Sequence, residues 1–235
     1  MQMSLNFLRS LFGQLKKMMS KDQDKFLKNV TGVIHIGANT GQERLHYNTL
    51  GLDVIWVEPI PDVFEQLTKN ISGLKKQVAY QYLLSDINGA SYVLNIASNG
   101  GMSSSILNLK QHREIWPTVD YVSAITLTSI TLNQLVTTEK IDLSRYQALV
   151  LDVQGAELLI LKGGGGLLKK FRYIKLEVAD FESYEKCCTV DEVSHFLKTQ
   201  GFEECSRKRF AERKAGGSYF DVVYRNKEKP DQVPF

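Results

Sequence analysis

The sequence predicts an α/β fold with a mostly parallel sheet, and three observations support this prediction. Short β-branched runs alternate with helical segments along most of the 235 residues, as is typical of βαβ units with right-handed crossovers. A glycine turn follows the first run, in "VIHIGANTGQ" at residues 33–42, as at the carboxyl end of a parallel strand. The composition, 43% hydrophobic and 23% charged, is that of a globular chain. A chain of this length suits one large domain.

The expected elements follow one another from residue 30 onward. Strands are predicted at 30–37, 52–59, 77–86, 89–97, 119–127, 146–152, 172–181, 202–208 and 216–226. Helices are predicted at 40–51, 61–73, 129–136, 156–168 and 189–201. Pro61 and Asp62 suit the first turn of a helix, and Gly51 and Gly201 suit helix ends. We expect the last two strands to form an antiparallel hairpin at the sheet edge.

Composition and charge limit the classes of function. The net charge of +3 is too small to indicate a nucleic-acid partner, and the basic cluster "RKRFAERK" at residues 207–214 is interrupted by an acid and predicts a solvated loop. Three cysteines without paired spacing favour a reducing, cytoplasmic environment and predict no structural zinc site.

Residues 1–28 predict an amphipathic helical extension, which leaves residues 29–235 as the single domain. Its apolar positions follow helical spacing: Leu5, Leu8, Leu11, Phe12, Leu15 and Met19. Such a helix packs on its own domain or on a second subunit, as in a homodimer, or it lies weakly on a membrane surface. No apolar run is long enough to span a bilayer.

Three predicted strand ends carry groups suited to a nucleoside. The turn from Gly37 to Gly41 can approach a ligand closely, but Asn39 occupies the position where a dinucleotide fingerprint has its second glycine. Glu58 ends the next strand, where an acid binds both ribose hydroxyls. Asp86 ends the third and can accept a hydrogen bond from an adenine amino group. A nucleoside site without a pyrophosphate cradle fits S-adenosylmethionine.

At these motifs the sequence resembles the FkbM-like branch of class I methyltransferases. The likeness lies, in order, in "VIHIGANTGQ", "WVEPIPDVFEQLTKNI", "LLSDINGA", "GGMSSSI", "AITLTSITLNQL", "LVLDVQGAELLILKGG" and "YIKLEV", over residues 33–178. The resemblance implies a Rossmann-like class I methyltransferase fold, with a seven-stranded sheet and helices on both faces, in a methyltransferase domain at 29–235. It also implies methylation of a hydroxyl on a sugar, a glycan or a related natural product. His35 departs from the family, which usually has an aspartate there.

The cofactor contacts expected from this resemblance lie in the turn, at the strand ends and in the loop at 98–106. The residues are His35, Gly37, Ala38, Asn39, Gly41, Glu58, Pro59, Ser85, Asp86, Ser104, Asp152 and Val153.

Methyl transfer to a hydroxyl needs a group that accepts the hydroxyl proton. Asp152 and Glu177 are predicted at neighbouring strand ends, where one could act as a base, or both could hold a divalent cation such as Mg²⁺ or Mn²⁺. The alternative is structural: Asp152 caps the next helix and a basic residue pairs with Glu177. His112 is a further candidate for the chemistry, and Trp116 for stacking on a sugar acceptor.

Two other functions fit part of the pattern. A nicotinamide-nucleotide-dependent oxidoreductase would bind a dinucleotide instead of S-adenosylmethionine. A non-catalytic nucleoside-binding protein would bind the cofactor but would lose no methyl transfer on replacement of Asp152.

Overall fold

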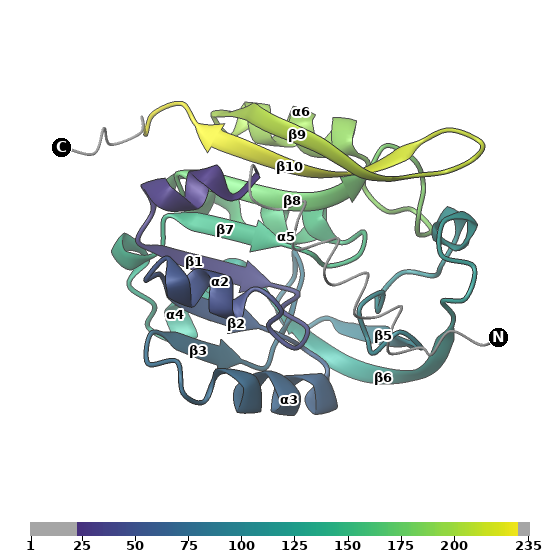
Figure 1. Ribbon diagram of the computed structural model, residues 1–235, viewed down its shortest axis with the longest axis horizontal. Coiled ribbons are helices and arrows are strands. Elements are labelled where there is room, and N and C mark those ends of the chain that lie inside the picture. Colours follow the sequence, from purple (N-terminus) through teal and green to yellow (C-terminus); the bar gives the residue numbers. More distant parts are fainter. Residues whose placement is uncertain (1–22, 230–235) are drawn as a thin grey trace.

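The computed structural model describes residues 23–229 and contains a seven-stranded sheet in the order β3-β2-β1-β7-β8-β10-β9 (Figure 1). Its strands are β1 (Gly32–Ile36), β2 (Asp53–Val57), β3 (Gln77–Tyr80), β7 (Ala148–Leu151), β8 (Tyr173–Ala179), β9 (Phe202–Glu212) and β10 (Ser218–Asn226). Neighbouring strands from β3 to β8 are parallel, and β10 runs antiparallel to both β8 and β9. The predicted sheet and its antiparallel hairpin are therefore confirmed.

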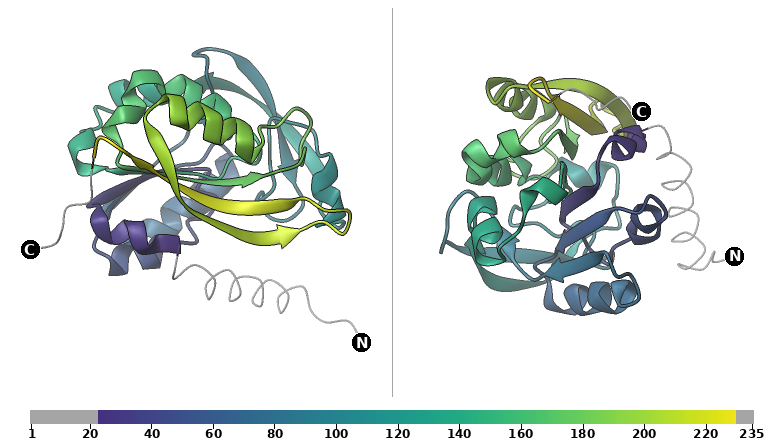
Figure 2. Two further views of the ribbon diagram at one scale, coloured as in Figure 1. Left: turned by 90° about the horizontal axis from the view of Figure 1, so that it is seen from above. Right: turned by 90° about the vertical axis from the view of Figure 1, so that its left-hand side faces the viewer.

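Helices cover both faces of this sheet (Figure 2). One face carries η1 (Gln23–Asn29), α2 (Arg44–Thr49) and α3 (Pro61–Ile71). The other carries α4 (Leu132–Thr138), α5 (Glu157–Gly164), η4 (Gly165–Lys170) and α6 (Val190–Thr199). Short turns of 3₁₀ helix lie at η2 (Gln111–Glu114) and η3 (Leu143–Arg145).

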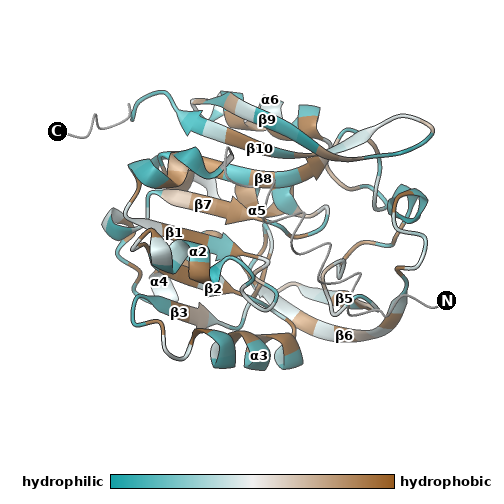
Figure 3. Cartoon of the chain, viewed as in Figure 1, coloured by the Kyte–Doolittle hydropathy of each residue, from teal (hydrophilic) through white to brown (hydrophobic). Residues whose placement is uncertain are grey.

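The central strands are apolar on both sides because both sides are covered. In β1, Ile34 and Ile36 belong to the core beneath α5 and α6, and Val33 belongs to the core beneath η1 and α2. Every residue of β1 and β7 is buried, and Figure 3 shows these strands mostly in the brown of apolar residues. This rigid centre fixes the loops that follow the carboxyl ends of the strands.

The predicted strand at 77–86 is wrong in one respect, because it is interrupted at Gln81 and Tyr82. β3 ends at Tyr80, and β4 (Leu83–Leu84) leaves the main sheet to pair with β6 (Tyr121–Ile130). Together with β5 (Ser91–Ala97), these strands form a second sheet in the order β4-β6-β5. The periodicity of this apolar run could not reveal the change of sheet, since both parts remain extended.

The basic cluster at 207–214 is strand and turn, and not the predicted solvated loop. Each of its arginines lies against a carboxylate: Arg207 pairs with Glu204, Arg209 with Glu212 and Arg213 with Glu114, at 2.7, 2.8 and 2.9 Å. The last pair ties the C-terminal hairpin to η2.

The described part of the N-terminal extension packs on the domain. Phe26 and Leu27 of η1 are 6% and 2% exposed, in the same apolar cluster as Trp56 of β2. The remainder of the predicted amphipathic helix, and with it the predicted membrane or subunit contact, lies outside the described residues. Within residues 23–229, no helix has the length and apolar character that crossing a membrane requires.

Candidate active site

The turn after β1 packs directly against the end of β7. The N–H groups of Gly37 and Ala38 both donate to the carbonyl oxygen of Val57, at 3.0 and 3.1 Å. Gly37 has φ +82°, and a Cβ atom there would lie 1.8 Å from the carbonyl oxygen of Asp152. Only glycine fits this position, so the turn brings the ends of β1, β2 and β7 together.

Glu58 follows the last residue of β2, and hydrogen bonds hold its carboxylate against the turn. Its Oε2 accepts the N–H of Asn39 at 2.8 Å, and its Oε1 accepts the N–H of Ile60 at 2.9 Å. The residue is 4% exposed, and burial raises the pKa of its carboxyl to about 7, although the two N–H donors act in the opposite direction. The structure thus holds an acid of shifted pKa beside the glycine turn.

The loop that joins β5 to η2 closes over this turn. The side-chain amide of Asn39 donates to the carbonyl oxygen of Gly100 at 3.1 Å. A Cβ atom at Gly101 would contact Ile60 at 3.3 Å, so the loop approaches the residues after β2 closely. The hydroxyl of Ser104 accepts the N–H of Ala97 at 3.0 Å and holds the loop in shape.

Ser85 and Asp86 follow β4 of the second sheet, and not a strand of the main sheet as expected. Ser85 is fully buried, and its hydroxyl donates to the carbonyl oxygen of Ile87 at 3.1 Å. A Cβ atom at Gly163 of α5 would lie 2.3 Å from the carbonyl oxygen of Ser85, so the turn packs against this helix. Contacts of Ser85, Asp86 and Pro59 with a cofactor stay predictions.

At the end of β7, a buried acid that was not among the predicted site residues organises the loop. Oε1 of Glu157 accepts the N–H groups of Val153 and Gly155, each at 3.1 Å. Ala156 is the N-cap of α5, so the alternative that Asp152 caps this helix is wrong. The spacing in "DVQGAE" was the available signal, because a carboxylate in the first turn of a helix can reach the free N–H groups before it.

Asp152 itself is half-buried, and its carboxylate is held from one side. Its N–H donates to the carbonyl oxygen of Ile36 at 3.0 Å, and its Oδ1 accepts the side-chain amide of Gln154 at 2.6 Å. The side chain of Val153 lies against Gly37. The acid is therefore fixed at the edge of the sheet where the turn and Glu58 also lie.

Glu177 is close in register to Asp152, but it lies within β8, which continues to Ala179, and not at the predicted strand end. Leu151 of β7 pairs with Leu176 of β8, and each acid comes one residue later. Glu177 lines a small polar cavity together with Glu157, Ser183 and Cys188. Among the described residues, however, no group of three or more His, Cys, Asp and Glu side chains is arranged to hold a metal ion. The structure therefore does not support the predicted divalent cation.

His112 lies in an aromatic cluster and is 1% exposed. Its ring centroid is 4.6 Å from that of Trp116 and 5.2 Å from that of Tyr184, and its Nε2 is 3.2 Å from the hydroxyl of Ser103. Burial, with a smaller contribution from Arg113, lowers the pKa of the imidazole to about 4. Such a ring is a weak base at neutral pH, and its part in the chemistry stays a prediction.

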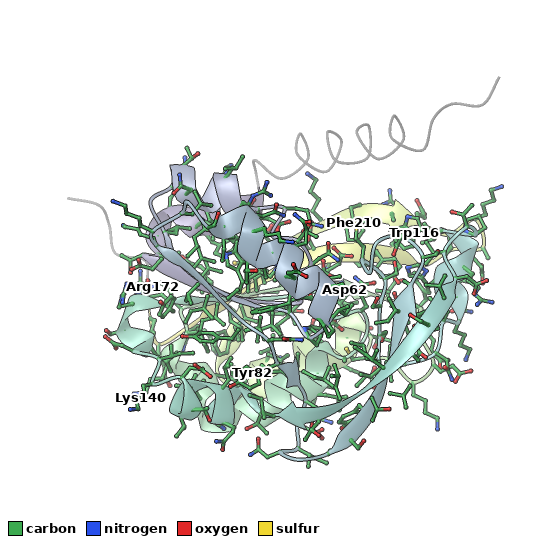
Figure 4. The ribbon with its side chains drawn as sticks, turned by 90° about the horizontal axis from the view of Figure 1, so that it is seen from below. Asp62, Tyr82, Trp116, Lys140, Arg172 and Phe210 are labelled. Atoms are coloured by element: carbon green, nitrogen blue, oxygen red, sulfur yellow. The ribbon has the colours of Figure 1, made fainter. Side chains whose placement is uncertain are left out.

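Trp116 is only half-buried but already has aromatic partners. It packs on Tyr219 at 5.1 Å and belongs to a cluster with Phe210, near which it lies in Figure 4. Its stacking on a sugar would use the part of the ring that this cluster leaves exposed.

His35 points into the core beneath α2. Its Nδ1 lies 3.2 Å from the hydroxyl of Tyr47, and its ring centroid is 5.0 Å from that of Trp56. At 5% exposed, the ring is packed as a core residue, which explains how an imidazole occupies this strand. A contact between His35 and the methionine part of a cofactor stays a prediction.

Two replacements of Glu157 are expected to show separately how its hydrogen bonds and its charge affect the free energy of unfolding. Burial raises the pKa of its carboxyl to about 7. Because the folded state binds this proton more tightly than the unfolded state, the contribution of Glu157 to stability falls as pH rises from about 4.5 through about 7. Glu157→Gln keeps an acceptor for both N–H groups and should match or exceed the wild-type free energy of unfolding at pH 8. Glu157→Ala should lower it by about 2 kcal/mol, because two buried donors lose their acceptor.

Urea denaturation at pH 5.5 and pH 8 measures this difference. The matched comparison is between the two variants, which differ in whether an acceptor remains. A glutamine variant as unstable as the alanine variant at pH 8 would contradict the assignment.

The sheet order, the glycine turn and the two strand-end acids define a class I, Rossmann-like methyltransferase fold. The chain belongs to the FkbM methyltransferase family, since the model of the "Methyltransferase FkbM domain" matches residues 35–204. The predicted family and fold are thus confirmed.

Individual proteins share part of the sequence or the fold of this chain. The 2-O-methyltransferase NoeI of Sinorhizobium fredii (strain NBRC 101917 / NGR234) is 28% identical over 160 residues, and the match spans 65% of each chain. Magnesium protoporphyrin IX methyltransferase from Synechocystis PCC 6803, solved with bound SAH, has a TM-score of 0.51 and 10% identity, over 95% of this chain and 88% of its own. An uncharacterized protein from Listeria monocytogenes serotype 4b has a TM-score of 0.51 and 14% identity, over 99% and 72%. These structures share the fold.

Proposed function

We propose that the protein is an S-adenosylmethionine-dependent O-methyltransferase that acts on a hydroxyl of a sugar, a glycan or a related natural product. The single observation that carries this proposal is the meeting of the Gly37 turn, Glu58 and Asp152 at one edge of the sheet. In this fold, ligands bind at the carboxyl ends of the parallel strands.

The residues present fit the nucleoside part of the cofactor. Each oxygen of Glu58 accepts one N–H group and keeps a second lone pair, so the carboxylate can still accept the two ribose hydroxyls. Asn39 places a side chain where a pyrophosphate would need bare backbone, and this argues for a ligand without that group. When bound, S-adenosylmethionine supplies an electrophilic methyl group.

Asp152 is the base that this geometry favours. As the acceptor oxygen forms its bond to the methyl carbon and the sulfur–methyl bond breaks, the carboxylate of Asp152 takes the hydroxyl proton. The amide of Gln154 binds Oδ1, so Oδ2 is outside that bond and available to the acceptor. The fixed loop supplies the orientation on which such a transfer depends.

An oxygen acceptor agrees with the name of the relative NoeI, a 2-O-methyltransferase. The proposal that the acceptor is a carbohydrate is based on the family resemblance. It is also based on the polar and aromatic groups of residues 98–116, a segment that contacts the turn at Gly100. Both the oxidoreductase and the non-catalytic alternatives lose support, because the family model covers residues 35–204.

Two measurements test the proposal. Calorimetry should show binding of S-adenosylmethionine and S-adenosylhomocysteine and no binding of a nicotinamide dinucleotide. Mass spectrometry of a glycan and metabolite panel incubated with protein and cofactor should show a gain of one methyl group on a hydroxyl. Absence of cofactor binding would end the proposal, and methylation of an amine would end its O-acceptor part.

Binding of the cofactor is expected to depend on pH through Glu58. With a pKa of about 7, the carboxyl is ionised and accepts hydroxyl hydrogen bonds above that pH, and it is protonated below. The affinity for S-adenosylmethionine should therefore fall about tenfold between pH 8 and pH 6. Glu58→Gln should bind more weakly at pH 8 and show a flat profile over this range.

Calorimetry at the two pH values measures the effect. Glu65→Gln is the matched control, because Glu65 is exposed on α3 and pairs with Lys69. A Glu58→Gln variant that keeps the wild-type pH dependence would show that another group is responsible.

A further inference from the structure

Gln154, two residues after Asp152, has an unusual backbone conformation. Its φ is +55°, in the left-handed region that residues with a Cβ atom rarely adopt, and Gly155 follows at φ +100°. A residue held in this region indicates that other contacts fix it, and such residues often gather at active sites.

Three hydrogen bonds hold Gln154 in this conformation. Its carbonyl oxygen accepts the hydroxyl of Ser105 at 2.8 Å. Its side-chain Oε1 accepts the hydroxyl of Tyr184 at 2.7 Å, and its Nε2 donates to Oδ1 of Asp152 at 2.6 Å. Main chain and side chain are thus both fixed.

The chemistry of the partners decides which way the amide points. The carboxylate of Asp152 can only accept, so Nε2 must face it, and Oε1 is left for the hydroxyl of Tyr184. A glutamate at this position would set two carboxylates against each other, and a shorter side chain would not span the two partners.

Tyr184 is well placed to fix the amide. It is fully buried, its ring packs on His112 at 5.2 Å, and its backbone forms a β-bridge with Leu109. Its hydroxyl cannot follow the amide if the amide rotates, because the ring is held on several sides.

We propose that Gln154 and Tyr184 are positioning residues that hold Asp152 with Oδ2 turned toward the acceptor hydroxyl. This inference rests on the proposed function of Asp152 as the base. The amide of Gln154 orients the carboxylate of Asp152 through their hydrogen bond. The hydroxyl of Tyr184 in turn keeps that amide from rotating. Loss of the hydroxyl leaves Asp152 in place but lets its carboxylate turn.

Tyr184→Phe tests this step because phenylalanine keeps the ring and removes the hydroxyl. Tyr219→Phe is the matched control, since Tyr219 lies in the same aromatic cluster and its buried hydroxyl forms no hydrogen bond with Gln154 or Asp152. With the acceptor found by the mass screen, Tyr184→Phe should lower kcat about 10- to 100-fold and leave the KM for the acceptor and the Kd of S-adenosylmethionine within about twofold. Tyr219→Phe should leave all three unchanged.

Nuclear magnetic resonance of the full ¹⁵N-labelled chain provides a second readout that needs no acceptor. The side-chain NH₂ signals of Gln154 are those absent from Gln154→Met. We expect them to move in Tyr184→Phe and in Asp152→Asn, and to stay in place in Tyr219→Phe. Wild-type kcat, or unmoved NH₂ signals, in Tyr184→Phe would overturn the inference. Wild-type kcat in Asp152→Asn would instead overturn the proposed role of Asp152 as the base. The failure of the positioning inference and the failure of the proposed base are therefore detected in different variants.

Discussion

Gly37→Ala is expected to leave almost no folded protein able to bind the cofactor. The added Cβ would lie 1.8 Å from the carbonyl oxygen of Asp152 and 2.7 Å from its carbonyl carbon. Both are backbone atoms at the end of a buried central strand, so neither can move without breaking the sheet. The conformation at φ +82° adds a further penalty of about 1 kcal/mol for alanine. We expect the free energy of unfolding to fall by more than about 4 kcal/mol.

Gly51→Ala is the control that separates the steric clash from the effect of the backbone conformation. Gly51 also has a left-handed φ, +70°, but no atom lies within 4 Å of the Cβ it would gain. The free energy of unfolding of Gly51→Ala should fall by only about 1 kcal/mol, because the backbone conformation is the only cause that applies there. Urea denaturation followed by circular dichroism, with calorimetry of S-adenosylmethionine binding, compares the two variants. Equal midpoints for both would mean that the turn after β1 does not pack on β7 as described.

The strand-end groups of the site could be predicted because parallel strands impose a common edge. Once the sequence indicates βαβ units, Gly37, Glu58 and Asp152 must lie at the carboxyl ends of β1, β2 and β7, and the structure brings them together there. The glycine turn was predicted to approach a ligand closely, and the structure adds that Gly37, Asn39 and Gly41 all have positive φ values, which glycine and asparagine tolerate.

Other parts of the site depend on contacts between distant segments, and local patterns do not carry them. Tyr184 reaches Gln154 across 30 residues, and Ser105 reaches it across 49. The break between β3 and β4 depends on pairing of Leu83 with Ser129, far along the chain. Glu157 was missed for a different reason. The spacing in "DVQGAE" allows its contact with the loop, but a carboxylate in the first turn of a helix is ordinary, and its complete burial becomes visible only in the folded chain.

Asp152→Asn is expected to lower kcat for methyl transfer by about 10²- to 10⁴-fold. Asparagine has nearly the same size as aspartate. Its Oδ1 can still accept the hydrogen bond from Nε2 of Gln154, which lies 2.6 Å from Oδ1 of Asp152 in the wild type. The loop and the cofactor turn should therefore be unchanged, and the Kd of S-adenosylmethionine should stay within about twofold. What disappears is the carboxylate that takes the proton of the acceptor hydroxyl.

Steady-state kinetics with the acceptor identified by the mass screen, together with calorimetry, measure both quantities. Asp62→Asn is the control, because Asp62 is exposed in the first turn of α3 and its replacement changes the net charge by the same amount. If Asp152→Asn retains wild-type kcat, the proton acceptor lies elsewhere, and Glu177, one residue beyond the strand pair of Leu151 and Leu176, is the next acid to replace. Loss of kcat in Glu177→Gln with full activity in Asp152→Asn would move the base from β7 to β8 while keeping the same edge of the sheet. Loss in both variants would show that the two neighbouring carboxylates act together.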